Sequence, residues 1–480
     1  PTSLIAKSNE NSYHRLMMAT DTNALITRLA SRLLRSPARV SILGFAVLIA
    51  IGTVLLMVPA ASTGKALGVV DALFMSTSAS CVTGLSVLDI SHGLTRYGQI
   101  VILVLAQVGG LGILTISTLL LMMVRKRPTL SGQALIKDTF TYGEGKRTAA
   151  AVLKAIFLTA FCIEAVGALG LYLRTAPEVG WGCAAYPAVF HAVSAFCNAG
   201  FSLYPDSFVG FREDWAVNAI LSVLIVVGGI GFIVIADVKK RFIERKTGVR
   251  RLSLHSRVAL TASAVLILLG AAAILVMEWG NTLAPLSVPG RIMAALFQSI
   301  TARTAGFNTL DIGTMANETL FFLCILMFIG ACPGSCGGGV KTTTVFGLWV
   351  LGVSRLRGYT RPRVFQRTLT EASVSKATSV VMVSMAVITL AIMVLMMSEL
   401  GGFSHAQTRG RFLELFFEAI SAFGTVGLST GATDTLSAMG RLTMVALMFI
   451  GRLGPMVIGL AVSRERVSRV HYAEENIMIG

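Results

Sequence analysis

Four short glycine-containing segments are the part of this 480-residue chain whose composition and spacing suit a chemical task. They read SASCVTGLS from residue 78, SAFCNAGFS from 194, ITARTAGFN from 300 and SAFGTVGLS from 421, with common glycines Gly84, Gly200, Gly306 and Gly427. Glycine reaches positive φ at little cost and lets several backbones approach one another. Such segments can therefore turn carbonyl oxygens toward a shared axis, where they can replace the hydration shell of a small cation.

The three residues that end at each common glycine form the predicted ion-selectivity filter and are called the filter segments below. They are Val82, Thr83, Gly84, Asn198, Ala199, Gly200, Thr304, Ala305, Gly306, Thr425, Val426 and Gly427. The side chains differ between copies, but the backbone would coordinate the ion. A half-length apolar segment ends at each filter segment, and the partial negative charge at its carboxyl end favours a cation over an anion.

The same order of apolar elements surrounds each filter segment. A first span is expected over 38–59, 149–173, 257–277 and 376–398, and a second span over 98–124, 215–236, 318–352 and 440–463. The segment between them, such as Val70–Ala79 or Leu413–Ala422, is too short to cross about 30 Å of hydrocarbon, so it predicts a re-entrant pore helix. We therefore expect an all-α polytopic membrane protein in which four tandem repeats, with eight spans and four re-entrant pore loops, surround one pseudo-fourfold pore.

The repeats also predict domain boundaries. A cytoplasmic amino-terminal tail covers 1–37, and the repeats cover 38–147, 148–254, 255–375 and 376–463. The third repeat contains a broken second span with a gating loop. The remaining residues, 464–480, form a polar carboxyl-terminal tail.

Composition and charge agree with a membrane location. The chain is 54% hydrophobic and only 14% charged, with a mean hydropathy of +0.75, whereas soluble domains carry roughly 25% charged residues. The formal charge of +17 comes mostly from the connections 125–147, 239–257 and 355–376 between spans, which disfavours nucleic acid as a partner. Positive-inside asymmetry places these connections and both termini in the cytoplasm.

The second span of the third repeat contains the sequence GACPGSCGGGVKTTT, from Gly330 to Thr344. A helix cannot run through it unbroken, because Pro333 removes a donor and the glycines weaken what remains. Irregular backbone at membrane depth must line a cavity or be covered by protein, so a flexible gate below the filter is expected. The predicted gate residues are Ala331, Cys332, Pro333, Gly334, Ser335, Cys336, Gly337, Gly338, Gly339, Lys341 and Arg452.

Three charged residues inside predicted spans or pore helices allow alternative interpretations. Arg452 could bind carbonyls of the gate, present an electrostatic barrier to cations, or extend to the interface. Glu164 and Glu418 could be structural carboxylates or ligands of a second, coupled ion.

Cys332 and Cys336 could form a metal or redox pair, but no further ligands complete such a site.

These residues resemble the Trk/Ktr/HKT superfamily of potassium transporters, and within it the Ktr-type translocating subunits. The resemblance covers about 38–480 and rests on the filter segments, on PGSCGGGVKTTT and on FIGRLGP at 449–455. It implies one pore per chain, a gating loop at about 331–341 and an opposing Arg452. In the superfamily a serine at the first filter glycine accompanies sodium permeability, so Gly84 implies selectivity for potassium, with K⁺ bound at the filter carbonyls.

The resemblance also implies partners. Ktr-type subunits form homodimers that sit on a cytosolic octameric ring of nucleotide-binding KtrA-like RCK subunits, so a nucleotide would act only through that partner. The carboxyl-terminal residues Asn476–Gly480 would reach into the dimer partner. Some relatives depend on Na⁺. Membrane lipid is the remaining implied partner, and the implied location is a bacterial inner membrane.

The alternative class is a polytopic membrane enzyme without a pore. It would need a nucleophile with its base, or a metal set, within the spans, and the chain has no HExxH motif. Ion flux in liposomes separates the two classes.

Overall fold

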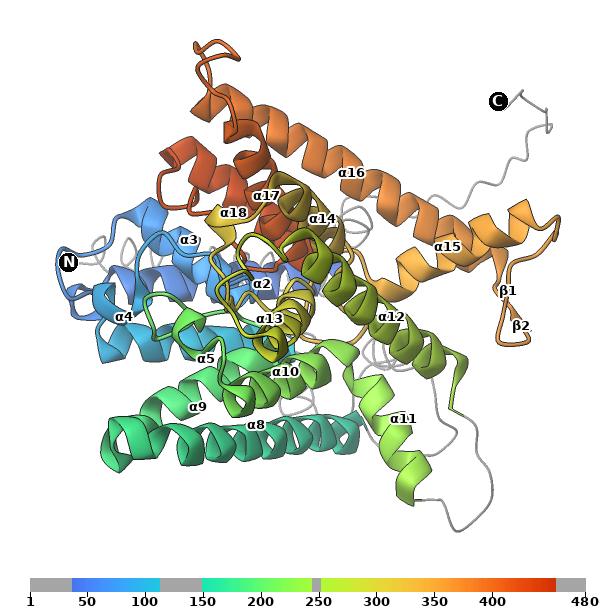
Figure 1. The fold of residues 1–480 in the computed structure, drawn as a ribbon, viewed down its shortest axis with the longest axis horizontal. Helices are drawn as coiled ribbons and strands as arrows, with labels where there is room; N and C mark the ends of the chain where they lie inside the picture. The colour runs from blue at the N-terminus through green and yellow to red at the C-terminus, as the bar shows by residue number, and fades with distance from the viewer. Residues whose placement is uncertain (1–36, 113–148, 244–251, 455–480) are drawn as a thin grey trace, which may run out of the picture.

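The computed structural model describes residues 37–112, 149–243 and 252–454, and within these ranges it is predominantly helical (Figure 1). A two-stranded antiparallel hairpin, β1 (Arg363–Val364) and β2 (Arg367–Thr368), lies between α15 and α16. Both predicted tails, apart from Pro37, fall outside the described residues, as does the basic connection 125–147. The expectation of a helical membrane protein agrees with the described part of the chain.

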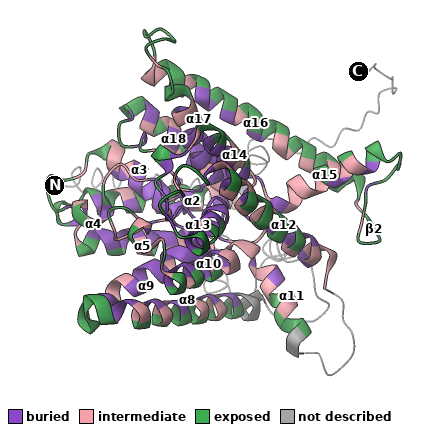
Figure 2. Ribbon diagram, viewed as in Figure 1, coloured by how far each residue is buried: buried purple, intermediate pink, exposed green. Residues whose placement is uncertain are grey.

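Four long apolar helices correspond to the predicted first spans: α2 (Pro37–Met57), α8 (Ala149–Val179), α12 (Leu254–Met277) and α16 (Glu371–Glu399). Their apolar stretches run from 19 to 29 residues, enough to cross a bilayer. They expose large apolar side chains such as Val166 and Leu268. These exposed surfaces suit lipid rather than water, and in Figure 2 the exposed residues follow the outer helices.

Four shorter helices precede the filter segments: α3 (Val69–Ser80), α9 (Trp181–Cys197), α13 (Val288–Thr301) and α17 (Arg411–Gly424). They have 12 to 17 residues and converge on the buried centre of the molecule (Figure 2). Each carries a fully buried phenylalanine, namely Phe74, Phe190, Phe297 and Phe417. The residue after each filter glycine is also a buried large apolar one: Leu85, Phe201, Phe307 and Leu428. A close-packed apolar core therefore fixes both ends of every filter segment.

The predicted second spans are shorter or bent in the structure. They contain α5 (Arg96–Leu111), α10 (Trp215–Ile230) with α11 (Phe232–Ile243), α14 (Asn317–Phe328) with α15 (Thr342–Leu356), and α18 (Ala438–Leu453). The sequence predicted a break only in the third, but α10 and α11 also meet at a bend of 99°. Gly231 causes this bend because it has a φ of 97°, and Gly112 and Gly454, with φ of 84° and 82°, end α5 and α18 in the same way. The predicted residues 113–124 and 455–463 lie outside the described part.

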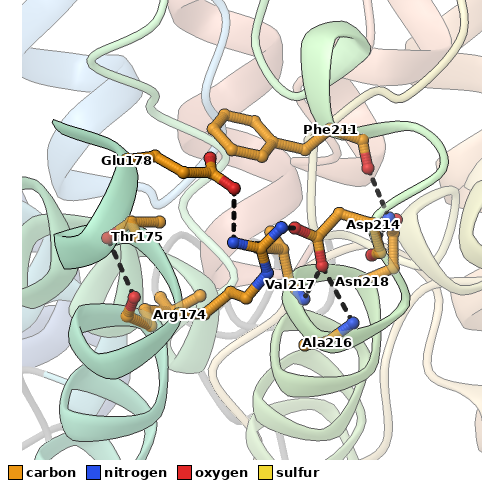
Figure 3. A network of polar contacts seen from close by, with 9 residues as sticks. Arg174, Thr175, Glu178, Phe211, Asp214, Ala216, Val217 and Asn218 are labelled. Atoms are coloured by element: carbon orange, nitrogen blue, oxygen red, sulfur yellow. Dashed lines mark hydrogen bonds and ion pairs between the residues drawn. The ribbon is translucent and has the colours of Figure 1, made fainter.

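Short elements connect the helices: η1 (Pro59–Ala61), α4 (Ile90–Gly93), η2 (Val209–Phe211) and η4 (Ile312–Thr314). A polar network fastens α8 to the start of α10 (Figure 3). The Arg174 guanidinium lies 2.5 Å from Glu178 and 2.8 Å from Asp214. Asp214 in turn accepts hydrogen bonds from the first backbone amides of α10, those of Ala216 and Val217, at 3.0 Å. The network sets the distance between the two helices that flank α9.

Candidate ion pathway

The four common glycines form a closed ring, in which each lies against the backbone of the next repeat. A Cβ atom added to Gly84 would lie 2.6 Å from the Ala199 carbonyl oxygen, and a Cβ added to Gly200 would lie 2.9 Å from the Ala305 carbonyl oxygen. A Cβ added to Gly306 would lie 2.5 Å from the Val426 carbonyl oxygen. A Cβ added to Gly427 would collide with the Thr83 carbonyl oxygen. The sequence predicted close approach of these four segments. The ring follows the order of the repeats and returns to the first, so it leaves no room for a side chain at these glycines.

The backbone of each filter segment has positive φ at its first and third residues. The common glycines have φ of 96°, 70°, 79° and 92°, and the residues two positions earlier, Val82, Asn198, Thr304 and Thr425, have φ of 58°, 58°, 72° and 49°. A left-handed non-glycine residue costs on the order of 1–3 kcal/mol and persists only where its surroundings impose it. The same strain at a valine, an asparagine and two threonines indicates that the backbone conformation is what the repeat preserves.

Three serines hold three of the filter segments, and sequence reasoning missed them. Ser78 Oγ donates to the Leu85 carbonyl at 2.6 Å and accepts from the Gly84 amide at 3.2 Å. Ser194 Oγ donates to the Phe201 carbonyl at 2.9 Å, and Ser421 Oγ accepts from the Gly427 amide at 3.2 Å. The third repeat has Ile300 at this position, visible in the aligned motifs. Its filter segment has no such hydroxyl to hold it.

His191 and Glu418, each nine positions before a common glycine, form hydrogen bonds with the chain that follows the filter segment. His191 Nε2 accepts from the Leu203 amide at 3.0 Å, and Glu418 Oε1 accepts from the Thr430 amide at 2.8 Å. Glu418 also accepts from the hydroxyls of Ser429 at 2.7 Å and Thr433 at 2.5 Å. These donors from the chain after the filter satisfy both oxygens of the Glu418 carboxylate, which fits its interpretation as a structural carboxylate.

The predicted gate residues form an ordered loop, called the gate loop below and comprising Ala331–Lys341. It folds against the break between α10 and α11: the amides of Cys332 and Cys336 donate to the carbonyls of Gly229 and Gly228 at 3.1 and 3.2 Å. The Phe232 amide donates to the Gly334 carbonyl at 3.0 Å. The backbone amides and carbonyls left free by the helix breaks in the second and third repeats therefore form hydrogen bonds with one another.

The gate loop also contacts the filter segments. The Gly338 amide donates to Thr425 Oγ1 at 3.0 Å. A Cβ added to Gly337 would collide with Thr304 Oγ1. Lys341 Nζ turns back to the Gly337 carbonyl at 2.7 Å, within the loop. The predicted gate thus lies directly against the third and fourth filter segments.

Arg452, at the end of α18, binds the gate loop from the other side. Its guanidinium donates to the carbonyls of Cys336 and Gly109, and to that of Gly110 at 3.5 Å. Gly109 and Gly110 are in the last turn of α5, where carbonyls carry the negative end of the helix dipole. These contacts match the interpretation in which Arg452 holds the loop by its carbonyls.

The other predicted candidates lie apart from the filter. Glu164 on α8 accepts from Gln107 Nε2 at 2.9 and 3.1 Å. Of the predicted pair Cys332 and Cys336, Cys332 Sγ lies 3.5 Å from Ser263 Oγ on α12. Cys197, which the sequence did not single out and which precedes the filter residue Asn198, has its Sγ 3.1 Å from Gln107 Oε1. In the described part of the chain, no three His, Cys, Asp or Glu side chains gather as a metal site.

Comparison with known proteins identifies the family. A family model described as TrkH, cation transport protein, matches residues 27–468. The chain belongs to the TrkH family of cation transport proteins. Two similar TrkH-family relatives are the Ktr system potassium uptake protein B of Bacillus subtilis and the potassium/sodium uptake protein NtpJ of Enterococcus hirae. Each is 36% identical over 452 residues, covering 93% of this chain and 97% of the relative.

A solved structure shows the same fold. The crystal structure of the potassium transporter TrkH from Vibrio parahaemolyticus matches with a TM-score of 0.70 and 19% identity, over 89% of this chain and 85% of that one. The TrkH-family resemblance drawn from the motifs is therefore confirmed. The relatives are ion transporters and not enzymes, so the alternative of a membrane enzyme loses its support. The chain is a multi-pass membrane protein.

Proposed function

We propose that this protein takes up potassium across the cell membrane through the ring of filter segments. The observation that carries the proposal is the closed contact of Gly84, Gly200, Gly306 and Gly427, each against a carbonyl of the next repeat. Such a ring places carbonyl oxygens from four segments around one axis, where they can replace the hydration shell of K⁺. The names of the similar relatives, potassium uptake and potassium/sodium uptake proteins, support this choice of ion.

The proposed pore consists of four repeats with eight spans and four re-entrant pore loops. Four long helices, four short helices that end at the ring, and a second helix after each ring segment support this arrangement. The proposed boundaries remain 38–147, 148–254, 255–375 and 376–463. Because α3, α9, α13 and α17 all end next to the ring, their negative ends favour a cation there.

Gating is assigned to the gate loop and Arg452. The loop blocks the pathway while the Gly338 amide binds Thr425 and Arg452 binds the Cys336 carbonyl. Conduction requires the loop to move away from both contacts. Gly334 and Gly339, with φ of 73° and 67°, give it conformations that other residues reach only with strain.

Regulation and assembly are also proposed from the relatives. The name "Ktr system" of a similar relative supports a regulatory partner subunit, proposed as a cytosolic KtrA-like RCK ring that binds the nucleotide. The translocating subunit is proposed to form a homodimer on this ring. Sodium dependence is proposed on the likeness to the potassium/sodium uptake protein. Both termini would be cytoplasmic, in a bacterial inner membrane.

Rubidium uptake tests the proposal. The full chain is expressed in a host that lacks potassium uptake, and radioactive rubidium uptake is measured with and without sodium and with and without a KtrA-like partner. Uptake above the empty-vector control is expected, with potassium as an effective competitor. A well-folded protein in the membrane that gives no uptake under any of the four conditions would overturn the proposal.

A further inference from the structure

Arg303 is a buried charge at the filter that the proposed function does not use. It directly precedes the filter residue Thr304, and its side chain is only 8% exposed. The corresponding positions in the other repeats are Cys81, Cys197 and Gly424, none of them basic. The third repeat is thus unique both in this arginine and in the gate loop.

The Arg303 guanidinium joins α12 to the end of the gate loop. Its Nη2 donates to Ser263 Oγ at 3.2 Å and to Thr342 Oγ1 at 3.0 Å, and its Nη1 donates to the Ser263 carbonyl at 3.5 Å. Thr342 is the first residue of α15, and its hydroxyl donates to the Gly330 carbonyl at 2.7 Å. Gly330 and Thr342 flank the gate loop, so Arg303 reaches both ends of it through one hydroxyl.

The chemistry of the site makes this contact sensitive to the loop. Among the described residues no carboxylate lies within ion-pair distance of Arg303, and its Nε has no hydrogen-bond partner there. Arg303 also shares a hydrogen bond with the side chain of Cys332, in the gate loop. A buried cation held by hydroxyls, a carbonyl and a thiol depends on each of them, because an unpaired charge in an apolar interior is costly. Displacement of Thr342 would therefore disturb Arg303.

The third filter segment lacks the support that the other three have. Serine hydroxyls hold the first, second and fourth segments, but Ile300 occupies the equivalent position here. The left-handed Thr304, with a φ of 72°, directly follows Arg303 in the chain. Thr304 Oγ1 accepts from Asn198 Nδ2 at 3.3 Å, and the Ala305 amide donates to the Thr301 carbonyl at 2.9 Å. On the chain side before Thr304, the segment is anchored by Arg303, whose guanidinium is fixed on Ser263 and Thr342.

We propose that Arg303 is a positioning residue that couples the gate loop to the third filter segment. This inference rests on the proposed function. With the loop in place, Thr342 holds Arg303, and Arg303 holds Thr304 in its left-handed conformation. When the loop moves, Thr342 is displaced and the third segment relaxes, so that ion selectivity changes together with gating.

Ion selectivity, measured with and without the gate loop, tests the coupling. The ratio of rubidium to sodium uptake is measured in liposomes for the full chain and for a chain lacking Cys332–Gly338, each with Arg303 or with Arg303→Gln. In the full chain the substitution should lower the ratio about tenfold, the change expected when one charge-assisted hydrogen bond is lost. In the deleted chain it should have no further effect, because the deletion has already displaced Thr342.

Two further variants keep the test decisive if Arg303→Gln does not fold. Thr342→Val keeps the arginine and its bonds to Ser263 and removes only the Thr342 hydroxyl, and it should lower the ratio in the full chain but not in the deleted one. Arg303→Lys should restore part of the ratio, since an ammonium can still reach one hydroxyl. Arg291→Gln is the matched control, because Arg291 lies on α13 and bonds the Leu286 and Ala284 carbonyls, far from the loop in sequence.

The outcomes distinguish a failure of this inference from a failure of the proposed function. If the unsubstituted chain carries no rubidium, the proposed function fails first. Arg291→Gln should leave the ratio unchanged in both backgrounds. If the unsubstituted chain carries rubidium and the Arg303 and Thr342 variants lower the ratio equally in both backgrounds, the role of Arg303 is merely structural and the coupling is wrong. Wild-type ratios in every variant would overturn it as well.

Discussion

Gly427 lies directly against the carbonyl oxygen of Thr83, so the last filter segment touches the first. This contact joins the first repeat to the fourth, whereas the other three ring contacts join repeats that are consecutive in the chain. The ring therefore cannot close until the fourth repeat has packed against the first. Selectivity should depend on contacts at all four junctions, and each can be tested with one substitution.

Gly84→Ser should let sodium permeate. The serine Cβ would lie 2.6 Å from the Ala199 carbonyl, and the residue would have to keep a φ of 96°. The displaced backbone should lower the rubidium-to-sodium uptake ratio by about tenfold, equal to about 1.4 kcal/mol of lost discrimination. Uptake of the two ions in liposomes measures this ratio.

Gly431→Ser is the matched control for that experiment. Gly431 has a similar φ of 94°, but nothing lies within 4 Å of an added Cβ. It therefore imposes the same backbone strain without the collision. An unchanged ratio in Gly84→Ser, or an equal fall in Gly431→Ser, would count against the filter assignment.

Deletion of Cys332–Gly338 should raise rubidium flux by removing the gate. The deletion takes away the Gly338 amide that binds Thr425 and the Cys336 carbonyl that binds Arg452. We expect an increase of about tenfold or more, equal to about 1.4 kcal/mol removed from the barrier. Flux is measured in liposomes with protein that elutes as a single species in detergent. A folded variant with unchanged or abolished flux would contradict the role of the loop.

Arg452→Gln distinguishes a loop-holding arginine from an electrostatic barrier. Loss of its charge-assisted bonds to Cys336 and Gly109, worth about 1.5–3 kcal/mol each, should raise rubidium flux in the full chain. If the arginine acts by holding the loop, the same substitution in the deleted chain should add nothing. A further rise in the deleted chain would favour the barrier.

Glu418→Gln should lower stability while leaving any sodium dependence intact. The carboxylate accepts bonds from Ser429, Thr430 and Thr433, and a neutral amide keeps only part of this acceptor capacity, at a cost of about 1–3 kcal/mol. The midpoint of thermal unfolding in detergent measures the loss. A variant of normal stability that no longer responds to sodium would instead make Glu418 a ligand of a coupled ion.

Sequence reasoning succeeded where the same local feature occurs four times. The close approach of the four common glycines and the half-length helices before them could be predicted because each copy supports the others. The proline and glycines after Gly330 likewise predicted a break from local chemistry alone, and the structure has one there.

The bend at Gly231 and the contacts of Arg303 could not be predicted in this way. A single glycine is tolerated within a helix, and Gly231 breaks α10 from α11 where the carbonyl of Pro333, from another repeat, lies against it. The partners of Arg303, Ser263 and Thr342, lie 40 and 39 residues away in the chain. Such contacts depend on how the repeats pack, which no pattern within one repeat encodes.

The ring in which each glycine meets the next repeat has a consequence for how ion preference can evolve. In a channel of four identical subunits, one codon change alters all four quarters of the filter at once. In the filter proposed for this chain, one codon change alters a single quarter and leaves three untouched. We therefore expect the balance between potassium and sodium to shift in small steps, each within reach of one mutation.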